Sequence, residues 1–139
     1  MRSLDDANLG FATFSTPTVV HFCAAFLISG IVNAPWHSLF RAGTLIGFTG
    51  LFGVLYMTRV IFLTRRITFY QLPLEDWLWF AILPMIAYLA MIASGVFLTT
   101  IPARALFALA GVTMLLIFIG IHNAWDVITY VGVDRSQDE

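Results

Sequence analysis

Four long apolar stretches constrain this chain more than any other feature of its sequence. A helix needs roughly 20 apolar residues to cross about 30 Å of hydrocarbon, and windows 18–34, 39–63, 77–98 and 103–130 approach or exceed that length. Of the 139 residues, 60% are hydrophobic and 11% are charged, whereas a soluble domain carries about 25% charged residues. We therefore predict an all-α fold, an integral membrane four-helix bundle that forms a single transmembrane domain over residues 1–139.

Prolines and hydroxyl side chains mark where the helices are expected to begin. The tripeptides Ser-Thr-Pro at 15–17 and Thr-Ile-Pro at 100–102 each place a capping residue just before a proline, and Ser38 can cap the second helix. Pro84 lies inside the third window. There we expect a kink and not a break, because lipid forces the backbone to keep its hydrogen bonds. Residues 1–11 contain two Asp and no basic cluster, so we expect no cleaved signal peptide.

The arginines predict the orientation of the bundle in a membrane. All seven basic residues are Arg, and loops rich in Arg stay in the cytoplasm. Five of them lie on one predicted side and two on the other: Arg2, Arg59, Arg65, Arg66 and Arg135 against Arg41 and Arg104. We predict a multi-pass protein of a bacterial-type inner membrane with both termini in the cytoplasm. The net charge of −1 gives no reason to expect a nucleic acid partner.

Small residues recur along two of the predicted helices. Gly43, Gly47 and Gly50 form a stripe of the GxxxG type on the second helix, which allows two helix backbones to approach closely. A second stripe of small or polar residues recurs at every fourth position from His21 to Asn33. The glycine stripe predicts either packing within the chain or a homo-oligomer through Gly43, Gly47 and Gly50.

Ionisable and amide side chains gather near the predicted cytoplasmic ends of the four helices. At a rise of about 1.5 Å per residue, His122 lies about 27 Å and Asp126 about 33 Å down the fourth helix, and Arg59 about 30 Å down the second. Four more polar residues belong to the same predicted level: His21, Glu75, Asp76 and Asn123. We predict that this set forms one polar layer facing the cytoplasm.

The spacing of His122 and Asp126 points to a specific chemistry. Residues four apart share a helix face, an arrangement that suits a carboxylate orienting an imidazole, a pair of metal ligands or a proton relay. A charge at the bilayer centre costs about 2.5 kcal/mol or more, so such groups usually serve a function. We predict a site that binds or conducts a proton, an ion or a small charged solute. In it His122 titrates, Asp126 orients it, Asn123 adds a hydrogen bond, and Arg59 supplies a counter-charge.

Simpler interpretations remain open for several of these residues. Glu75 and Asp76 suit the first turn of a helix because the helix dipole favours acids there. Arg59 can extend to the headgroups, and His21 can be a satisfied hydrogen-bond partner between helices. The chain has one cysteine, no HExxH and no zinc-ligand spacing, so we predict no metal site. Two histidines on different helices still leave a haem or metal ligand pair open, and the cofactor stays undetermined.

The segment from Leu72 to Pro84, LPLEDWLWFAILP, resembles the Pro-x-Glu-Glu/Asp helix start of the small membrane-embedded lycopene cyclases of the heterodimeric type. The resemblance covers Pro73, Glu75 and Asp76 and implies that the acidic pair supplies the proton that triggers ring closure of an isoprenoid. It offers an alternative function, an enzyme acting on a lipid or isoprenoid with Glu75 or Asp76 as a buried general acid. A third alternative is a non-catalytic subunit that packs against larger membrane proteins.

Overall fold

The computed structural model describes residues 2–67 and 74–135, with side chains for residues 16–65, 74, 75 and 77–129. This part of the chain is all-helical, as predicted. Its elements in order are α1 (Arg2–Asn33), α2 (Leu39–Ile67), α3 (Leu74–Trp77), the π-helical turn η1 (Leu78–Ile82), α4 (Leu83–Phe97) and α5 (Pro102–Arg135). Four segments are long and apolar enough to cross a membrane, namely Thr16–Asn33, Leu39–Arg65, Leu78–Phe97 and Pro102–Thr129.

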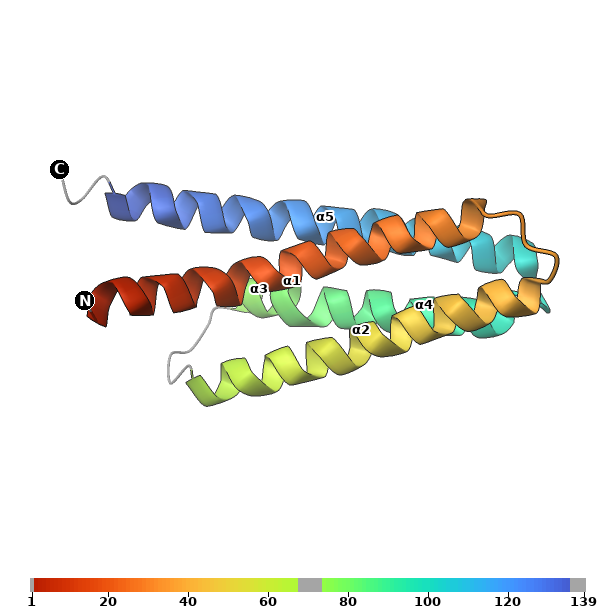
Figure 1. Cartoon of the computed structure of the whole chain (residues 1–139), viewed down its shortest axis with the longest axis horizontal. Coiled ribbons are helices and arrows are strands. Elements are labelled where there is room, and N and C mark those ends of the chain that lie inside the picture. Colours follow the sequence, from red (N-terminus) through yellow and green to blue (C-terminus); the bar gives the residue numbers. More distant parts are fainter. Residues whose placement is uncertain (1, 68–73, 136–139) are drawn as a thin grey trace.

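The four long segments form an elongated bundle (Figure 1). Helix α2 packs against α4, α4 against α5, and α5 against α1. The start of α1 and the end of α5 lie at one end of the bundle, and the connections 34–38 and 98–101 lie at the other. We call the first of these the termini end. It also holds the end of α2 and all of α3, so the elements that carry the predicted site residues meet at this end.

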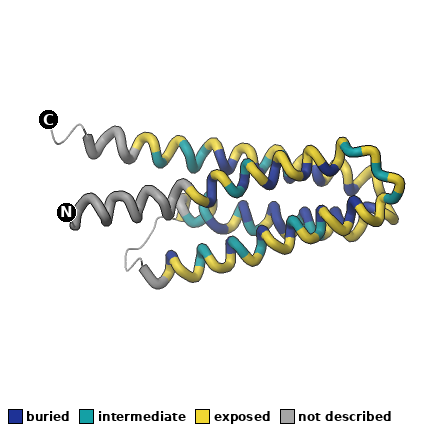
Figure 2. Tube along the Cα trace, viewed as in Figure 1, coloured by how far each residue is buried: buried dark blue, intermediate teal, exposed yellow. Residues whose placement is uncertain are grey.

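Each helix buries one stripe of side chains and exposes the rest (Figure 2). On α1 the buried positions include Thr18, His21, Ala25 and Ile28, spaced three and four residues apart as interlocking helices require. Only 22 to 39% of the residues in each span are buried. The outer surface is correspondingly apolar, and Phe107 for example is 84% exposed. Such a continuous apolar surface suits lipid and not water.

The glycine stripe of α2 is used inside the chain. A Cβ added at Gly43 would overlap the carbonyl oxygen of Gly95 on α4, and one at Gly50 would lie 2.8 Å from Cγ1 of Ile92. At Gly47 the same test finds no atom within 4 Å. The stripe therefore lets α2 and α4 approach closely at Gly43 and Gly50. Association of copies through these glycines stays a prediction, and in this fold only Gly47 has room for a further contact.

The predicted helix starts were right at two places and wrong at one. The carbonyl of Ser38 accepts from the amides of Arg41 and Ala42, so α2 starts directly after Ser38 as predicted, and α5 begins at Pro102. The start predicted at residues 15–17 is wrong, because α1 begins at Arg2 and continues through Pro17. A proline has a φ angle that fits a helix and removes one backbone hydrogen bond. A helix that continues on both sides of the proline can therefore contain it.

The third span continues across Pro84 through a local widening of the helix. The amide of Leu83 donates to the carbonyl of Leu78, five residues back, which is the bond of a π turn. Pro84 follows at once and has no amide proton to restore the regular ladder. The span thus stays helical across Pro84, with the π turn η1 immediately before it in the chain, and the kink stays a prediction.

Candidate functional site

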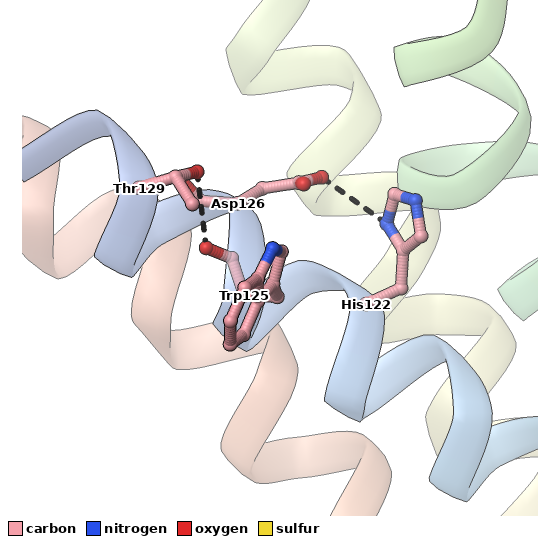
Figure 3. A network of polar contacts seen from close by, with 4 residues as sticks. All are labelled: His122, Trp125, Asp126 and Thr129. Atoms are coloured by element: carbon pink, nitrogen blue, oxygen red, sulfur yellow. Dashed lines mark hydrogen bonds and ion pairs between the residues drawn. The ribbon is translucent and has the colours of Figure 1, made fainter. Parts of the chain in front are cut away.

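His122 and Asp126 lie together near the termini end of α5 (Figure 3). The Nδ1 atom of His122 is 3.1 Å from Oδ2 of Asp126, although the approach lacks the direction of a hydrogen bond. The side chains are 32% and 57% exposed, respectively. The hydroxyl of Thr129 donates to the carbonyls of Trp125 and Asp126, at 3.1 and 3.0 Å. These bonds involve backbone carbonyls only, and the carboxylate of Asp126 faces His122.

The other partner of His122 comes from a different element. The indole of Trp79, in the π turn η1, lies parallel to the imidazole, with ring centroids 4.1 Å apart and an interplanar angle of 7°. A parallel stack at this distance is a close aromatic contact. The π turn carries Trp79, so the irregular part of the third span supplies one wall of the site. The imidazole therefore lies between a carboxylate on its own helix and an indole on the neighbouring span.

Two groups that can attract a cation lie against the imidazole of His122. The carboxylate of Asp126 attracts an imidazolium across 3.1 Å, and an indole face attracts a cation by about 0.5–1 kcal/mol at exposed sites. Both contacts are weaker for the neutral ring. Because the His122 side chain keeps 32% of its surface exposed, a proton or small solute can reach it. The imidazole is thus partly exposed near the termini end of the bundle.

His21 lies in a different environment, inside the bundle. Its side chain is 0% exposed, as is that of Tyr88 on α4. The Nδ1 atom of His21 lies 2.9 Å from the hydroxyl of Tyr88, and the two rings are 5.8 Å apart at 42°. The interpretation of His21 as a hydrogen-bond partner between helices agrees with this contact.

The remaining predicted residues are spread around the termini end. The side chains of Arg59 and Glu75 are exposed, and Asn123 is partly buried beside His122. The burial that a general acid at Glu75 would need is therefore not found, and the side chain of Asp76 lies outside the described residues. In the described ranges, no group of three or more His, Cys, Asp or Glu could hold a metal ion. The predicted polar layer is therefore not one site. His122 lies beside Asp126, His21 contacts Tyr88 inside the bundle, and Arg59 and Glu75 are separate exposed side chains.

Sequence reasoning missed two partners of the histidines, Trp79 at His122 and Tyr88 at His21. Neither residue was singled out from the sequence as a partner of a histidine. A signal existed for Trp79, because it stands five residues before a proline inside an apolar span and a proline there disturbs the backbone. For Tyr88 the signal was a phenol in the middle of an apolar run, since a buried hydroxyl needs a partner.

Comparison with known proteins finds no relative of this chain. No family model, no curated protein and no solved structure matches the chain. The resemblance of Leu72–Pro84 to lycopene cyclases therefore stays a prediction.

Proposed function

We propose that this chain is a multi-pass protein of a bacterial-type inner membrane that binds a proton at its cytoplasmic end. His122 is the group that takes up the proton, and Asp126 orients it and stabilises the charge. The observation that carries the proposal is the position of the imidazole, 3.1 Å from a carboxylate oxygen and stacked at 4.1 Å on Trp79. A small charged solute that pairs with the imidazolium is the second ligand this site can take.

The cytoplasmic assignment rests on charge. Arg59 and Arg65 belong to the end of α2 at the termini end, whereas Arg41 and Arg104 begin α2 and α5 at the opposite end. The guanidinium of Arg65 lies 5.2 Å from the ring centroid of Trp77, an aromatic–arginine contact typical of a membrane surface. The excess of Arg at the termini end favours its retention in the cytoplasm. Arg59 is exposed, which favours contact with headgroups over a role as a counter-charge to His122.

Binding is favoured over conduction by a single copy. Between the level of Tyr88 and the opposite end, the buried core includes Met91, Leu98 and Leu109. The one buried hydroxyl recorded in this stretch, Ser94, donates to the carbonyl of Ala90 in its own helix, at 2.8 Å. A proton path needs a chain of polar groups or water, and these described side chains offer none.

Trp79 makes proton binding measurable. In a chain whose other tryptophans, Trp36, Trp77 and Trp125, are replaced by Phe, the indole stacked on His122 is the only one left. Imidazolium quenches a stacked indole, so in nanodiscs we expect the fluorescence to fall when the pH is lowered and a proton binds. His122→Gln should remove this response. His37→Gln, at the exposed histidine of the connection at the other end, should keep it.

Asp126→Asn tests the role of the carboxylate. A helix pair four residues apart contributes about 0.3–1 kcal/mol when exposed, so the change of Trp79 fluorescence with pH should be smaller than in the parent chain but not lost. A Trp79 signal that does not depend on pH, or that responds equally in His122→Gln, would refute proton binding at this site. Vesicles loaded with a pH-sensitive dye separate binding from conduction, because a binding protein leaves an imposed pH gradient intact.

A further inference from the structure

Thr18 and His21 hold two buried polar atoms without a hydrogen-bond partner in the described part of the chain. The residues are 7% and 0% exposed, and the atoms concerned are Oγ1 of Thr18 and Nε2 of His21. Three residues apart on α1, the side chains share a face, with Cβ atoms about 5–6 Å apart. An unsatisfied buried polar group is costly, so two of them on one face mark a place where an added polar atom is stabilised.

Thr18 departs from the behaviour of other hydroxyls in the spans. The hydroxyls of Ser29, Thr44 and Thr113 donate to the carbonyl four residues earlier, at 2.8–2.9 Å. This bond satisfies a hydroxyl within its own helix. The hydroxyl of Thr18 makes no such bond, although it is more deeply buried than those of Ser29 and Thr44. It is available to an atom that does not belong to its helix.

The contact with Tyr88 determines which partner His21 requires. If the Tyr88 hydroxyl donates to Nδ1, across 2.9 Å, the ring proton is on Nε2 and one donor is unsatisfied. If Nδ1 donates to Tyr88, both the phenol proton and Nε2 need partners. The first arrangement leaves fewer buried groups unsatisfied. Nε2–H of His21 and the hydroxyl of Thr18 are then two unsatisfied donors on one face of α1.

We infer that Thr18 and His21 form a buried site for one neutral acceptor oxygen, supplied by a water molecule or by the ester carbonyl of a lipid. Either oxygen has two lone pairs and can accept from both donors. An anion is disfavoured because a charge buried without a counter-charge is very costly, and Arg59 is exposed. Both residues belong to the candidate span Thr16–Asn33. The site is separate from His122 and does not depend on proton uptake there.

Thr18→Val tests whether the hydroxyl has a ligand, because valine keeps the shape and removes the polar group. The matched control is Thr113→Val, whose hydroxyl is satisfied by Leu109 of its own helix. In nanodiscs, we expect the unfolding equilibrium constant of Thr18→Val to rise by about fivefold or more, with little change for Thr113→Val. A Thr18→Val chain as stable as the wild type, or more stable, overturns the inference, since removing an idle buried hydroxyl relieves a cost.

Nuclear magnetic resonance of the full chain with ¹⁵N-labelled histidine tests the same site without unfolding. We expect Nε2 of His21 to carry the proton and its resonance to move upfield in Thr18→Val but not in Thr113→Val. A cross-peak from this proton to water in both diester and diether lipid nanodiscs assigns the oxygen to water. A cross-peak to a ¹³C-labelled ester carbonyl, lost in diether lipid, assigns it to lipid. An Nε2 atom without a proton, or a resonance equally unaffected by both substitutions, overturns the inference.

Discussion

Tyr88 connects three helices at the level of His21. Its side chain is 0% exposed, its hydroxyl contacts Nδ1 of His21 on α1 at 2.9 Å, and a Cβ added at Gly53 on α2 would overlap its ring. Gly53 thus makes room for a phenol that no ordinary side chain at this position would admit. The hydroxyl then satisfies one nitrogen of a buried imidazole, which would otherwise need water.

Removing the Tyr88 hydroxyl should destabilise the bundle. Tyr88→Phe keeps the ring against Gly53 and leaves Nδ1 of His21 without its partner, so we expect a loss of about 1–2 kcal/mol in the free energy of unfolding. Denaturation in mixed detergent micelles measures it. Tyr56→Phe is the control, since Tyr56 on α2 is only partly buried and should change stability by about 0.5 kcal/mol or less. Equal stability of the two variants would contradict the role given to Tyr88.

Helices α2 and α4 pack closely because the glycines at their contact have no side chains. Gly43 and Gly95 face each other so closely that a Cβ on either would overlap the other's carbonyl or lie 2.6 Å from it. Without a hydrophobic effect between helices in lipid, this close packing is the main source of attraction. A glycine pair of this kind fixes how α2 and α4 are rotated, and therefore which side chains enter the core.

Gly43→Ala and Gly47→Ala form a matched pair that tests this packing. Alanine at position 43 forces α2 and α4 apart, so we expect a loss of about 1–3 kcal/mol. Alanine at position 47 meets no atom within 4 Å and should be neutral or stabilise by up to about 1 kcal/mol, since alanine favours the helix. Thermal unfolding in detergent measures both. If Gly47→Ala instead dissociates an oligomer in sedimentation, the stripe is a contact between copies.

The π turn η1 determines where Trp79 lies relative to the rest of the third span. Pro84→Ala adds an amide proton that the carbonyl of Phe80, four residues back, can accept, which favours a regular helix. A change of one residue in the register of the helix rotates the preceding turn by about 100° about the helix axis. This rotation would move the indole of Trp79 away from His122. We expect the pH response of the Trp79 fluorescence to be reduced in this variant, measured in the chain without the other tryptophans. A full response in Pro84→Ala would mean that the proline does not position Trp79.

At the scale of the whole molecule, the number and placement of the spans could be predicted from the sequence because they depend on length and polarity alone. The rotation of each helix about its axis could not. It depends on contacts between helices such as that of Gly53 with Tyr88, and a single sequence does not specify its partners. For this reason the sequence placed His21 and His122 at a similar depth, whereas only the structure separates a fully buried imidazole from one that is 32% exposed.

The orientation of the bundle in the membrane can be measured by labelling single cysteines at its two ends. Cys23 is the only cysteine in the chain, so Cys23→Ala gives a background for placing single cysteines at exposed positions of opposite ends. In intact cells, a membrane-impermeant maleimide should label His37→Cys, in the connection 34–38, because that end faces away from the cytoplasm. Glu75→Cys, in α3 at the termini end, should react only after the membrane is permeabilised. The reverse pattern would place His122 outside the cytoplasm and contradict the orientation derived from the arginines.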